Sequence, residues 1–368
     1  MTPKRLIVCA DDYAFTPGVS RSIRELLAAQ AISATSVMAA SPFWPEEAAA
    51  LRAVAGSADI GLHVTLTDQT PLGPMPSYAP DGKLPPIPRV FKAGLMRRLP
   101  LVEIEAEIER QLDRFIEVWG APPAHIDGHH HVQQLPGIRE LIVRLARRIG
   151  PDRTWVRNGA DPAARIARRG VATGKSLLIA TLGRGIRRLA AREGVPTNDG
   201  FSGAYDFATE TRPMRVLFGA FLQGAGENAL LFCHPGYSDA TLAGLDSMTT
   251  VRDGEHAFLL SAAWRDLVAA IGLERVLRDD GALFLNIGAT AANPWLTHLV
   301  PLALRDLLVL QNTIHWIKSI TVETRSGETL SVGHFKPINS KRYLNDCHEY
   351  VYHFTKTGEE AIDRLAVG

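Results

Sequence analysis

The feature that most constrains the fold of this chain is an alternation of strand-length apolar runs with helix-like segments. The run 5–10 (RLIVCA) precedes helical spacing in 19–32 (VSRSIRELLAAQAI), and the pattern continues through 34–40 (ATSVMAA), 45–56 (PEEAAALRAVAG) and 59–66 (DIGLHVTL). Alternation of this kind predicts an α/β fold with a largely parallel sheet covered by helices.

Composition narrows the class of protein. With 368 residues, 46% hydrophobic and 21% charged, the chain can bury a sizeable core and is expected to hold more than one domain. The formal net charge of +1 provides no general attraction for nucleic acid or an anionic bilayer, so such binding would have to be local. Three widely spaced cysteines and an N-terminus without a signal-peptide pattern favour a reducing, cytoplasmic setting.

The stretch 124–136 (AHIDGHHHVQQLP) holds four histidines and an aspartate, a density that indicates metal binding or catalysis. If 125–131 is extended, His130 points to one face of the strand. The other four ionisable side chains would then share the opposite face as candidate ligands or supporting residues: His125, Asp127, His129 and His131.

Four apolar runs end in ionisable residues: LIVCADD, IGLHVTLT, AHIDGHHHV and LLFCHPG. In barrels of parallel strands the carboxyl ends of the strands meet at one mouth. This would bring five side chains together: Asp11, Asp12, His63, His129 and His234. Two imidazoles and a carboxylate commonly hold a catalytic divalent ion, while an adjacent carboxylate can take a proton from water. The alternatives are that the aspartates cap a helix and that His63 is a buried core residue.

Other segments carry weaker predictions. Residues 69–100, rich in proline and glycine, are expected to form a long loop. Residues 101–120 are the clearest helix, with Gly120 as its stop, and 174–194 form a basic helical stretch. This basic stretch is either a solvated helix face or a lid or peripheral membrane contact.

Four motifs, IVCADDYAFTPGVSRSI, IGLHVTLT, PAHIDGHHHV and LLFCHPGYSD, resemble in order and spacing the YdjC-like carbohydrate deacetylase family, which includes chitooligosaccharide deacetylase. The resemblance covers about residues 4–270, and the overall sequence is most similar to the hopanoid biosynthesis-associated members. It implies a distorted (β/α) barrel and metal-dependent removal of acetyl from an N-acetylated amino sugar. A glycosylated hopanoid lipid is one candidate substrate.

The resemblance also implies roles for individual residues. Asp11 would be the general base, His234 would protonate the leaving amine, and Arg157, in TWVRNGAD, would orient Asp11. A divalent ion, zinc or magnesium, would be held by three ligands: Asp12, His63 and His129.

After about residue 272 the character of the sequence changes. Residues 274–368 resemble part of a site-specific DNA adenine or cytosine-N4 methyltransferase, the later strands of its Rossmann-like sheet. They lack its glycine-rich cofactor loop and its Asp-Pro-Pro-Tyr-type motif. We therefore expect a deacetylase barrel over 1–272 and an inactive methyltransferase-like fragment over 273–368, with 281–288 (GALFLNIG) serving as the final barrel strand.

Three functions remain open at this point. The leading one is a metal-dependent deacetylase acting on an acetylated amino sugar or glycolipid, in a chain that is a candidate homo-oligomer. The second is a protein that modifies or binds nucleic acid through its tail, which the neutral overall charge disfavours. The third is a metal-dependent phosphoesterase on the same barrel, disfavoured because only one conspicuous ligand set is present.

Overall fold

The computed structural model describes residues 6–207, 210–245, 250–276, 282–287, 296–305, 309–317, 319–323, 329–333 and 348–355. The chain divides into two compact units, Met1–Arg265 and Asp266–Gly368. All the candidate site residues lie in the first unit, so its architecture decides how they meet.

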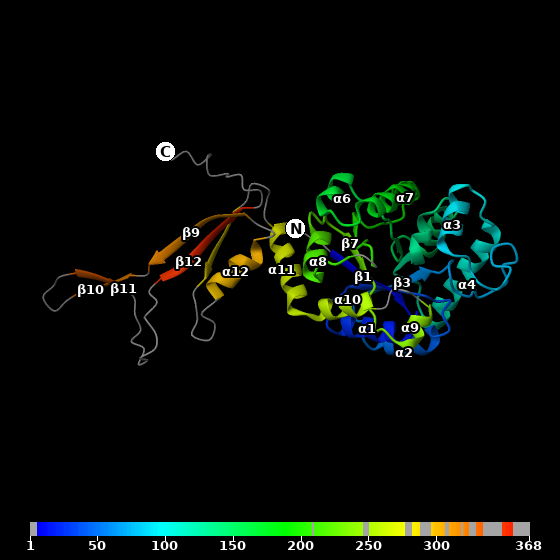
Figure 1. Ribbon diagram of the computed structural model, residues 1–368, viewed down its shortest axis with the longest axis horizontal. Helices are drawn as coiled ribbons and strands as arrows, with labels where there is room; N and C mark the ends of the chain where they lie inside the picture. The colour runs from blue at the N-terminus through cyan, green and yellow to red at the C-terminus, as the bar shows by residue number, and fades with distance from the viewer. Residues whose placement is uncertain are drawn as a thin grey trace. The chain divides into compact units, whose positions relative to one another are not determined.

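A curled sheet of seven strands forms the centre of the first unit (Figure 1). Its strands lie in the order β5-β4-β3-β2-β1-β7-β6, and every pairing between them is parallel. The predicted α/β class and parallel sheet are thus confirmed. The strands are β1 (Leu6–Tyr13), β2 (Ala34–Val37), β3 (Asp59–Val64), β4 (His125–Gly128), β5 (Trp155–Val156), β6 (Phe201–Ser202) and β7 (Ala229–Cys233).

A short segment, 196–202, links the two edges of this half-barrel. On one side the N–H of Val156 in β5 donates to the carbonyl oxygen of Pro196 (2.9 Å), and Asn198 exchanges amide hydrogen bonds with Asn158. On the other side the same segment becomes β6, which pairs with β7. These hydrogen bonds give partners to buried backbone groups at both edges of the sheet.

Helices surround the sheet of the first unit (Figure 1). They are α1 (Pro17–Ala28), α2 (Trp44–Arg52), α3 (Ile87–Leu95), α4 (Leu101–Trp119), α5 (Ile138–Ile149), α6 (Ala163–Arg169), α7 (Thr173–Glu193), α8 (Met214–Leu222), α9 (Ala240–Leu245) and α10 (Thr250–Leu260), with α11 (Ala262–Val276) at the boundary. Among the described residues, none of these helices is both long and apolar enough to cross a bilayer.

Local sequence explains where the helices begin and end. The side chain of Thr16 caps α1 by accepting the Val19 N–H (3.2 Å). Thr16, and not Asp11 or Asp12, is therefore the residue that caps this helix. The predicted helix over 101–120 is confirmed as α4, and Gly120 ends it with a φ of 86°, a conformation that favours glycine.

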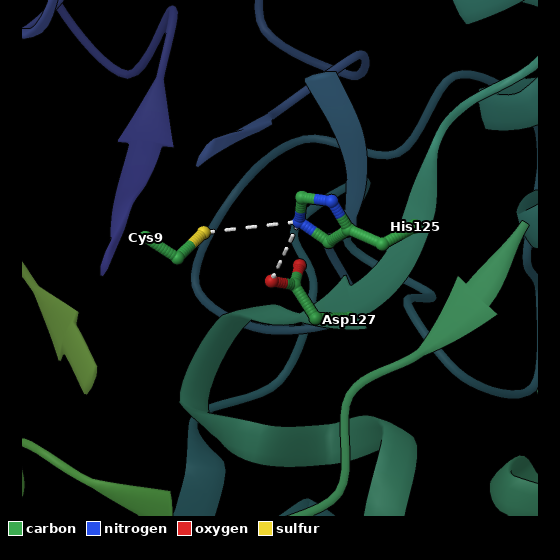
Figure 2. Close-up of side chains that lie close together, drawn as sticks. All are labelled: Cys9, His125 and Asp127. Atoms are coloured by element: carbon green, nitrogen blue, oxygen red, sulfur yellow. Dashed lines mark hydrogen bonds and ion pairs between the residues drawn. The ribbon is translucent and has the colours of Figure 1, made fainter. Parts of the chain in front are cut away.

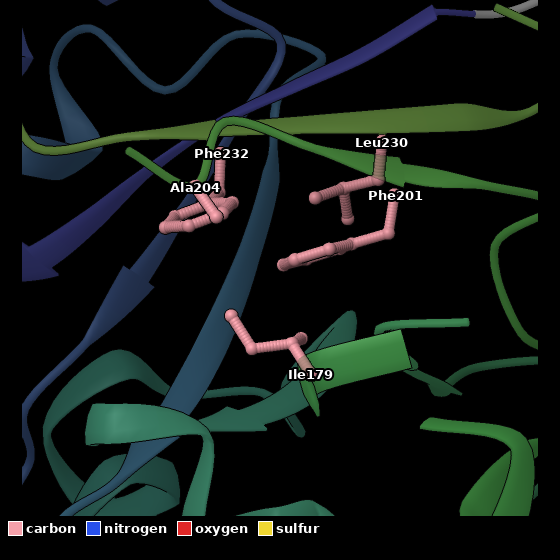
Figure 3. Packing of buried hydrophobic residues seen from close by; sticks show 5 residues of the cluster. All are labelled: Ile179, Phe201, Ala204, Leu230 and Phe232. Atoms are coloured by element: carbon pink, nitrogen blue, oxygen red, sulfur yellow. The ribbon is translucent and has the colours of Figure 1, made fainter. Parts of the chain in front are cut away.

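A cluster of buried apolar residues packs β6 and β7 against α7 (Figure 3). The rings of Phe201 and Phe232 stack with centroids 4.9 Å apart, and Ile179 of α7 belongs to the same cluster. Burial of such side chains stabilises the fold by roughly 1.5–3 kcal/mol each. The cluster thereby holds the closing strand β6 in place.

Two predictions about individual segments are wrong. Residues 69–100 are not a continuous loop, because Ile87–Leu95 form the amphipathic helix α3, which begins after the extended N-cap residue Pro86. The segment 281–288 does not complete the barrel. Its strand β8 (Ala282–Ile287) pairs instead with β12 (His348–Thr355) in a separate sheet.

The second unit contains two small antiparallel sheets. In one, β12 lies between β8 and β9 (Val309–Ile317) and is antiparallel to both; in the other, β10 (Ser319–Glu323) pairs with β11 (Thr329–Gly333). The hydroxyl of Tyr352 in β12 donates to the carbonyl oxygen of Thr297 in α12 (Leu296–Leu304) at 2.5 Å. Strand pairing and this contact organise the unit internally.

Replacing Gly203, which follows β6, should destabilise the closing strand. Gly203 has a φ of 115°, and a Cβ there would lie 2.1 Å from the carbonyl oxygen of Phe232. We expect Gly203→Ala to lower the free energy of unfolding by at least about 2 kcal/mol in urea denaturation. The control is Gly174→Ala in α7, where a Cβ meets nothing within 4 Å. Equal stabilities of the two variants would contradict this account of β6.

Candidate functional site

A cavity of about 550 Å³ lies at the carboxyl ends of β1, β3, β4 and β7. Part of its lining is ionisable: Asp11, Asp12, His63, Asp68, His129, His130, His131, Lys175, His234 and Arg252. The rest is largely apolar and includes Phe15, Ile87, Phe91, Leu135, Leu178, Leu182, Phe207 and Phe232. The five side chains predicted to converge from distant strand ends therefore meet at one cavity.

Asp11 and Asp12 are consecutive in the sequence, yet both line this cavity. Side chains of consecutive strand residues normally point to opposite faces of a sheet. Here the pairing of β1 with β2 shifts register between Ala10 and Tyr13, and Asp12 has a φ of 69°. A bulge of this kind redirects a side chain, so one strand end presents two carboxylates to the same space.

Three side chains form a compact set of metal-type donors. The Oδ1 atom of Asp12 lies 3.0 Å from Nδ1 of His129 and 3.3 Å from Nε2 of His63. Candidate ligand atoms of the three residues all lie within 4.8 Å of one another. Because zinc binds oxygen and nitrogen ligands at about 2.0–2.2 Å, one ion can reach all three atoms.

The second nitrogen of the His63 ring is held by the protein. Its Nδ1 lies 2.6 Å from Oδ1 of Asp127 and 3.0 Å from Oγ of Ser36. A carboxylate that accepts the Nδ1–H fixes the tautomer in which Nε2 carries a lone pair. Burial opposes a charge on His63, yet Asp127 and Asp12 raise its pKa to about 10. The local field therefore favours a positive charge here.

The buried guanidinium group of Arg157 contacts the carboxylates of both Asp11 and Asp127. Arg157 donates through Nη1 to Oδ2 of Asp11 (2.7 Å) and through Nη2 to Oδ1 of Asp11 (2.6 Å). The same Nη2 lies 2.5 Å from Oδ2 of Asp127. A bidentate pair fixes orientation as well as distance, so Arg157 sets the positions of Asp11 and of the residue that orients His63.

A second group of metal-type donors lies deeper, behind the cavity (Figure 2). Nε2 of His125 lies 3.8 Å from Sγ of Cys9 and 3.6 Å from Oδ2 of Asp127. Arg157 also reaches Cys9, with Nη2 2.9 Å from Sγ, and burial raises the pKa of the thiol. A cysteine binds a metal only as the thiolate, and the Arg157 guanidinium already supplies a positive charge beside Cys9. We therefore interpret Cys9, His125 and Asp127 as residues that pack around Arg157. The His125 ring stacks on Trp155 with centroids 4.5 Å apart.

The prediction of an extended 125–131 stretch is wrong beyond Gly128. Strand β4 ends there, and His129–Gln134 form a 3₁₀ helix in which His130 and His131 have φ values of 55° and 59°. The turn places His129 beside Asp12 and directs His131 into apolar packing. The His131 ring lies edge-on to Phe232, with centroids 5.1 Å apart, and burial lowers its pKa.

His234 directly follows β7 and faces the cavity between two aromatic rings. Phe207 and Phe232 both lie edge-on to it, with centroids 5.3 Å away. Its backbone N–H donates to Oε2 of Glu255 (2.5 Å), and Oε1 of Glu255 accepts the hydroxyl of Tyr205 (2.6 Å). Burial lowers the pKa of His234 to about 4, so its resting form at neutral pH is the uncharged imidazole.

Sequence reasoning missed three residues that shape this site: Ser36, Arg252 and Glu255. Arg252 donates through Nη2 to Oδ2 of Asp12 (2.8 Å), leaving Oδ1 toward the histidines. Arg252 and Glu255 are three residues apart on α10, which is one helical turn, so a single helix contacts both Asp12 and His234. The three-residue spacing of Arg252 and Glu255 was the only sequence signal for this pair, and it is not specific, because charged residues with this spacing occur in most helices.

Comparison with known proteins places this arrangement in a family. Residues 5–270 match the model of the YdjC-like protein family. The chain belongs to the YdjC-like family. The predicted resemblance to that family is therefore confirmed, whereas the hopanoid-associated subgroup and the methyltransferase-like tail stay predictions.

Individual relatives of this YdjC-like chain are similar over most of their own length. It is 31% identical over 241 residues to chitooligosaccharide deacetylase from Enterobacter sp. (strain 638), covering 65% of this chain and 84% of that protein. It is 33% identical over 242 residues to the enzyme of that name from Serratia marcescens, with the same coverage, 65% and 84%.

A solved structure shares the fold of the YdjC-like chain. It is a crystal structure of an Enterococcus faecalis V583 protein proposed to cleave cellobiose phosphate. The likeness has a TM-score of 0.56 at 24% identity and covers 74% of this chain and 96% of that one. It supports the architecture alone.

The buried Glu255 should make stability depend on pH. Burial raises its pKa from 4.5 to about 7, so the folded protein holds this proton more tightly than the unfolded chain does. The resulting stabilisation is complete below pH 4.5 and is lost as the pH rises through about 7. Over that range the wild type should lose about 3 kcal/mol of unfolding free energy relative to Glu255→Gln.

Urea denaturation across this pH range measures the difference between wild type and Glu255→Gln. The control is Glu117→Gln on the exposed face of α4, for which the difference from wild type should not change with pH. A pH-independent difference for Glu255→Gln would show that Glu255 does not titrate as its burial implies.

Proposed function

We propose that this protein is a hydrolase that removes the acetyl group from an N-acetylated amino sugar. The observation that carries the proposal is a three-residue metal-type donor set, Asp12, His63 and His129, beside a second oriented carboxylate, Asp11, on one cavity. The relatives from Enterobacter and Serratia are chitooligosaccharide deacetylases, and this reaction suits the residues that the cavity presents.

The donor set fits a divalent cation. Two imidazoles and one carboxylate leave coordination positions free, and zinc accepts imidazole more readily than magnesium does. A divalent ion held by Asp12, His63 and His129 would supply Lewis acidity, which lowers the pKa of water and polarises an amide carbonyl. Asp127 and Arg252 would fix the orientation of His63 and Asp12 from behind.

Asp11 is the proposed general base. Arg157 binds both of its oxygens, and Ser36 donates to Oδ1 at 3.4 Å, so the carboxylate cannot rotate freely. A carboxylate has about four lone-pair sites, so it retains capacity to accept a proton from the attacking water. Arg157 holds Asp11 as the proposed base, whereas Arg252 holds Asp12 as the proposed metal ligand, so the two neighbouring aspartates have different roles.

His234 is the proposed acid for the leaving amine. It lines the cavity, and its Nδ1 has no hydrogen-bond partner among the described residues. Since its resting form is uncharged, the proton that it gives must be one that it takes up during turnover. The water oxygen joins the acyl carbon, the carbon–nitrogen bond breaks, the nitrogen gains a proton, and acetate and a free amino sugar leave.

The cavity lining favours a substrate that has an apolar part. Phe91, Leu178, Leu182 and Phe207 face the same space as the ionisable residues. A sugar linked to a lipid would place its acetamide among the ionisable groups and its apolar part along these side chains. We therefore propose an acetylated glycolipid, with a glycosylated hopanoid as the leading candidate.

The tail does not enter this mechanism. Residues 274–368 stay predicted as a methyltransferase-like fragment without its own activity, and the motifs that would bind its cofactor and a flipped base are absent from the sequence. The residues proposed above all precede the tail, so the deacetylase proposal does not depend on it.

Removing one ligand should remove the metal. We expect His129→Ala to lose bound zinc in elemental analysis and to lower acetate release from an acetylated chitooligosaccharide at least about 100-fold, since loss of outer-sphere partners alone costs about 10–100-fold. The matched control is His130→Ala, the neighbouring histidine outside the donor set, which should retain the metal. Full metal content in His129→Ala would refute the ligand assignment.

Removing the base should leave the metal in place. We expect Asp11→Asn to retain bound metal but to lower the turnover number by about 10²–10⁴-fold, the usual contribution of a general base. Asp113→Asn, on an exposed position of α4, is the control and should match the wild type. An Asp11→Asn protein that keeps both metal and activity would exclude Asp11 as the base.

A further inference from the structure

One corner of the first unit exposes an unusual amount of apolar surface. It comprises residues 89–102, from α3 through the start of α4, and is called the α3 corner below. Figure 1 shows the two helices at one end of this unit. Four of its apolar side chains are exposed: Leu95 (52%), Met96 (47%), Leu101 (39%) and Val102 (84%).

The α3 corner is also strongly basic. No acidic residue occurs between Asp81 and Glu103, while Arg89, Lys92, Arg97 and Arg98 are all exposed. The Glu103 carboxylate is already used, accepting the backbone N–H groups of Ser77 and Tyr78 (3.0 Å each). The corner therefore carries four positive charges without a free carboxylate among them.

These four cations differ from the exposed arginines of α5 that face α4. On α5, Arg144 and Arg148 pair with Glu105 and Glu109 of α4. No ion pair involves Arg89, Lys92, Arg97 or Arg98 within the part of the chain that the structure describes. Exposed apolar side chains lower the solubility of a surface without serving its fold, so a partner that covers them and meets the neighbouring cations is the simpler explanation.

Helix α3 connects this corner to the cavity. Ile87 and Phe91 line the cavity, and Leu95 follows Phe91 by four residues, one turn further along the same helix face. An apolar stripe thus runs along α3 from the ionisable site to the exposed corner. A long apolar ligand could follow this stripe between the two.

We propose that the α3 corner docks on an anionic lipid bilayer. Apolar side chains that enter the interface and flanking cations that meet lipid phosphates are the two components of reversible surface binding. None of the exposed apolar side chains is aromatic, so the corner lacks the stacking surfaces typical of nucleic-acid binding. If the substrate is a lipid-linked sugar, it could reach the cavity from the bilayer along α3, and this part of the proposal rests on the proposed function. Docking on the bilayer does not depend on the proposed function.

Sedimentation of the full chain with vesicles tests the proposal. We expect binding to vesicles that contain phosphatidylglycerol and little binding to phosphatidylcholine alone. Arg97→Gln/Arg98→Gln should weaken binding at least about tenfold, because one cation near the surface contributes about fivefold. Leu95→Ser/Met96→Ser should weaken it as well. The control Arg144→Gln/Arg148→Gln removes the same charge from α5 and should stay within about twofold of wild type.

Three results would overturn the proposal. The first is equal loss of binding in the α5 control, which would mean that only net charge matters. The second is binding that ignores the Leu95→Ser/Met96→Ser change. The third is a DNA duplex that binds as tightly as the anionic vesicles and depends on Arg97 and Arg98 alone, which would make the corner a polyanion site.

Activity separates this proposal from the proposed function. All the corner variants should release acetate from a short acetylated chitooligosaccharide at the wild-type rate, because none touches the ionisable site. Loss of vesicle binding with intact hydrolysis in the variants supports docking. A wild type that binds vesicles but releases acetate neither from this sugar nor from an acetylated glycolipid would leave docking standing and remove the deacetylase assignment.

Discussion

The candidate site depends on one buried guanidinium. Arg157 is 1% exposed and binds both oxygens of Asp11 while contacting Asp127, which in turn holds the His63 ring. Buried carboxylates are costly unless they are paired, and this cation pairs with Asp11 at the cavity wall and with Asp127 behind it. The orientation of the proposed base and that of a proposed ligand therefore have a common origin.

Counting the buried charges explains why the site favours a cation. Three carboxylates, Asp11, Asp12 and Asp127, are accompanied by two guanidinium groups, Arg157 and Arg252, so one further positive charge is needed, from a protonated His63 or from a cation that binds in place of that proton. Buried unpaired charges are destabilising. A divalent ion at Asp12 would compensate the excess and leave a positive field where the carbonyl oxygen of a substrate gains negative charge.

Part of this site followed from sequence because its residues end apolar strands. The carboxyl ends of parallel strands meet at one edge of a sheet, so Asp11, His63 and His234 could be placed together without coordinates. Arg252 and Glu255 could not be placed in this way. They reach the site from α10, and the face that a helix turns toward the cavity depends on how it packs against the strands.

By itself the sequence determined the strand-and-helix alternation, the α/β class and the histidine-rich strand end, because these depend on local periodicity and residue type. The tertiary structure alone decided how the donors are aimed. The bulge that turns Asp12 beside Asp11, and the 3₁₀ turn after Gly128 that separates His129 from His131, are backbone departures from regular strand geometry. Both departures depend on how the strands pair with their neighbours at the edge of the cavity, and the residue pattern along one strand does not show which strands pair with it.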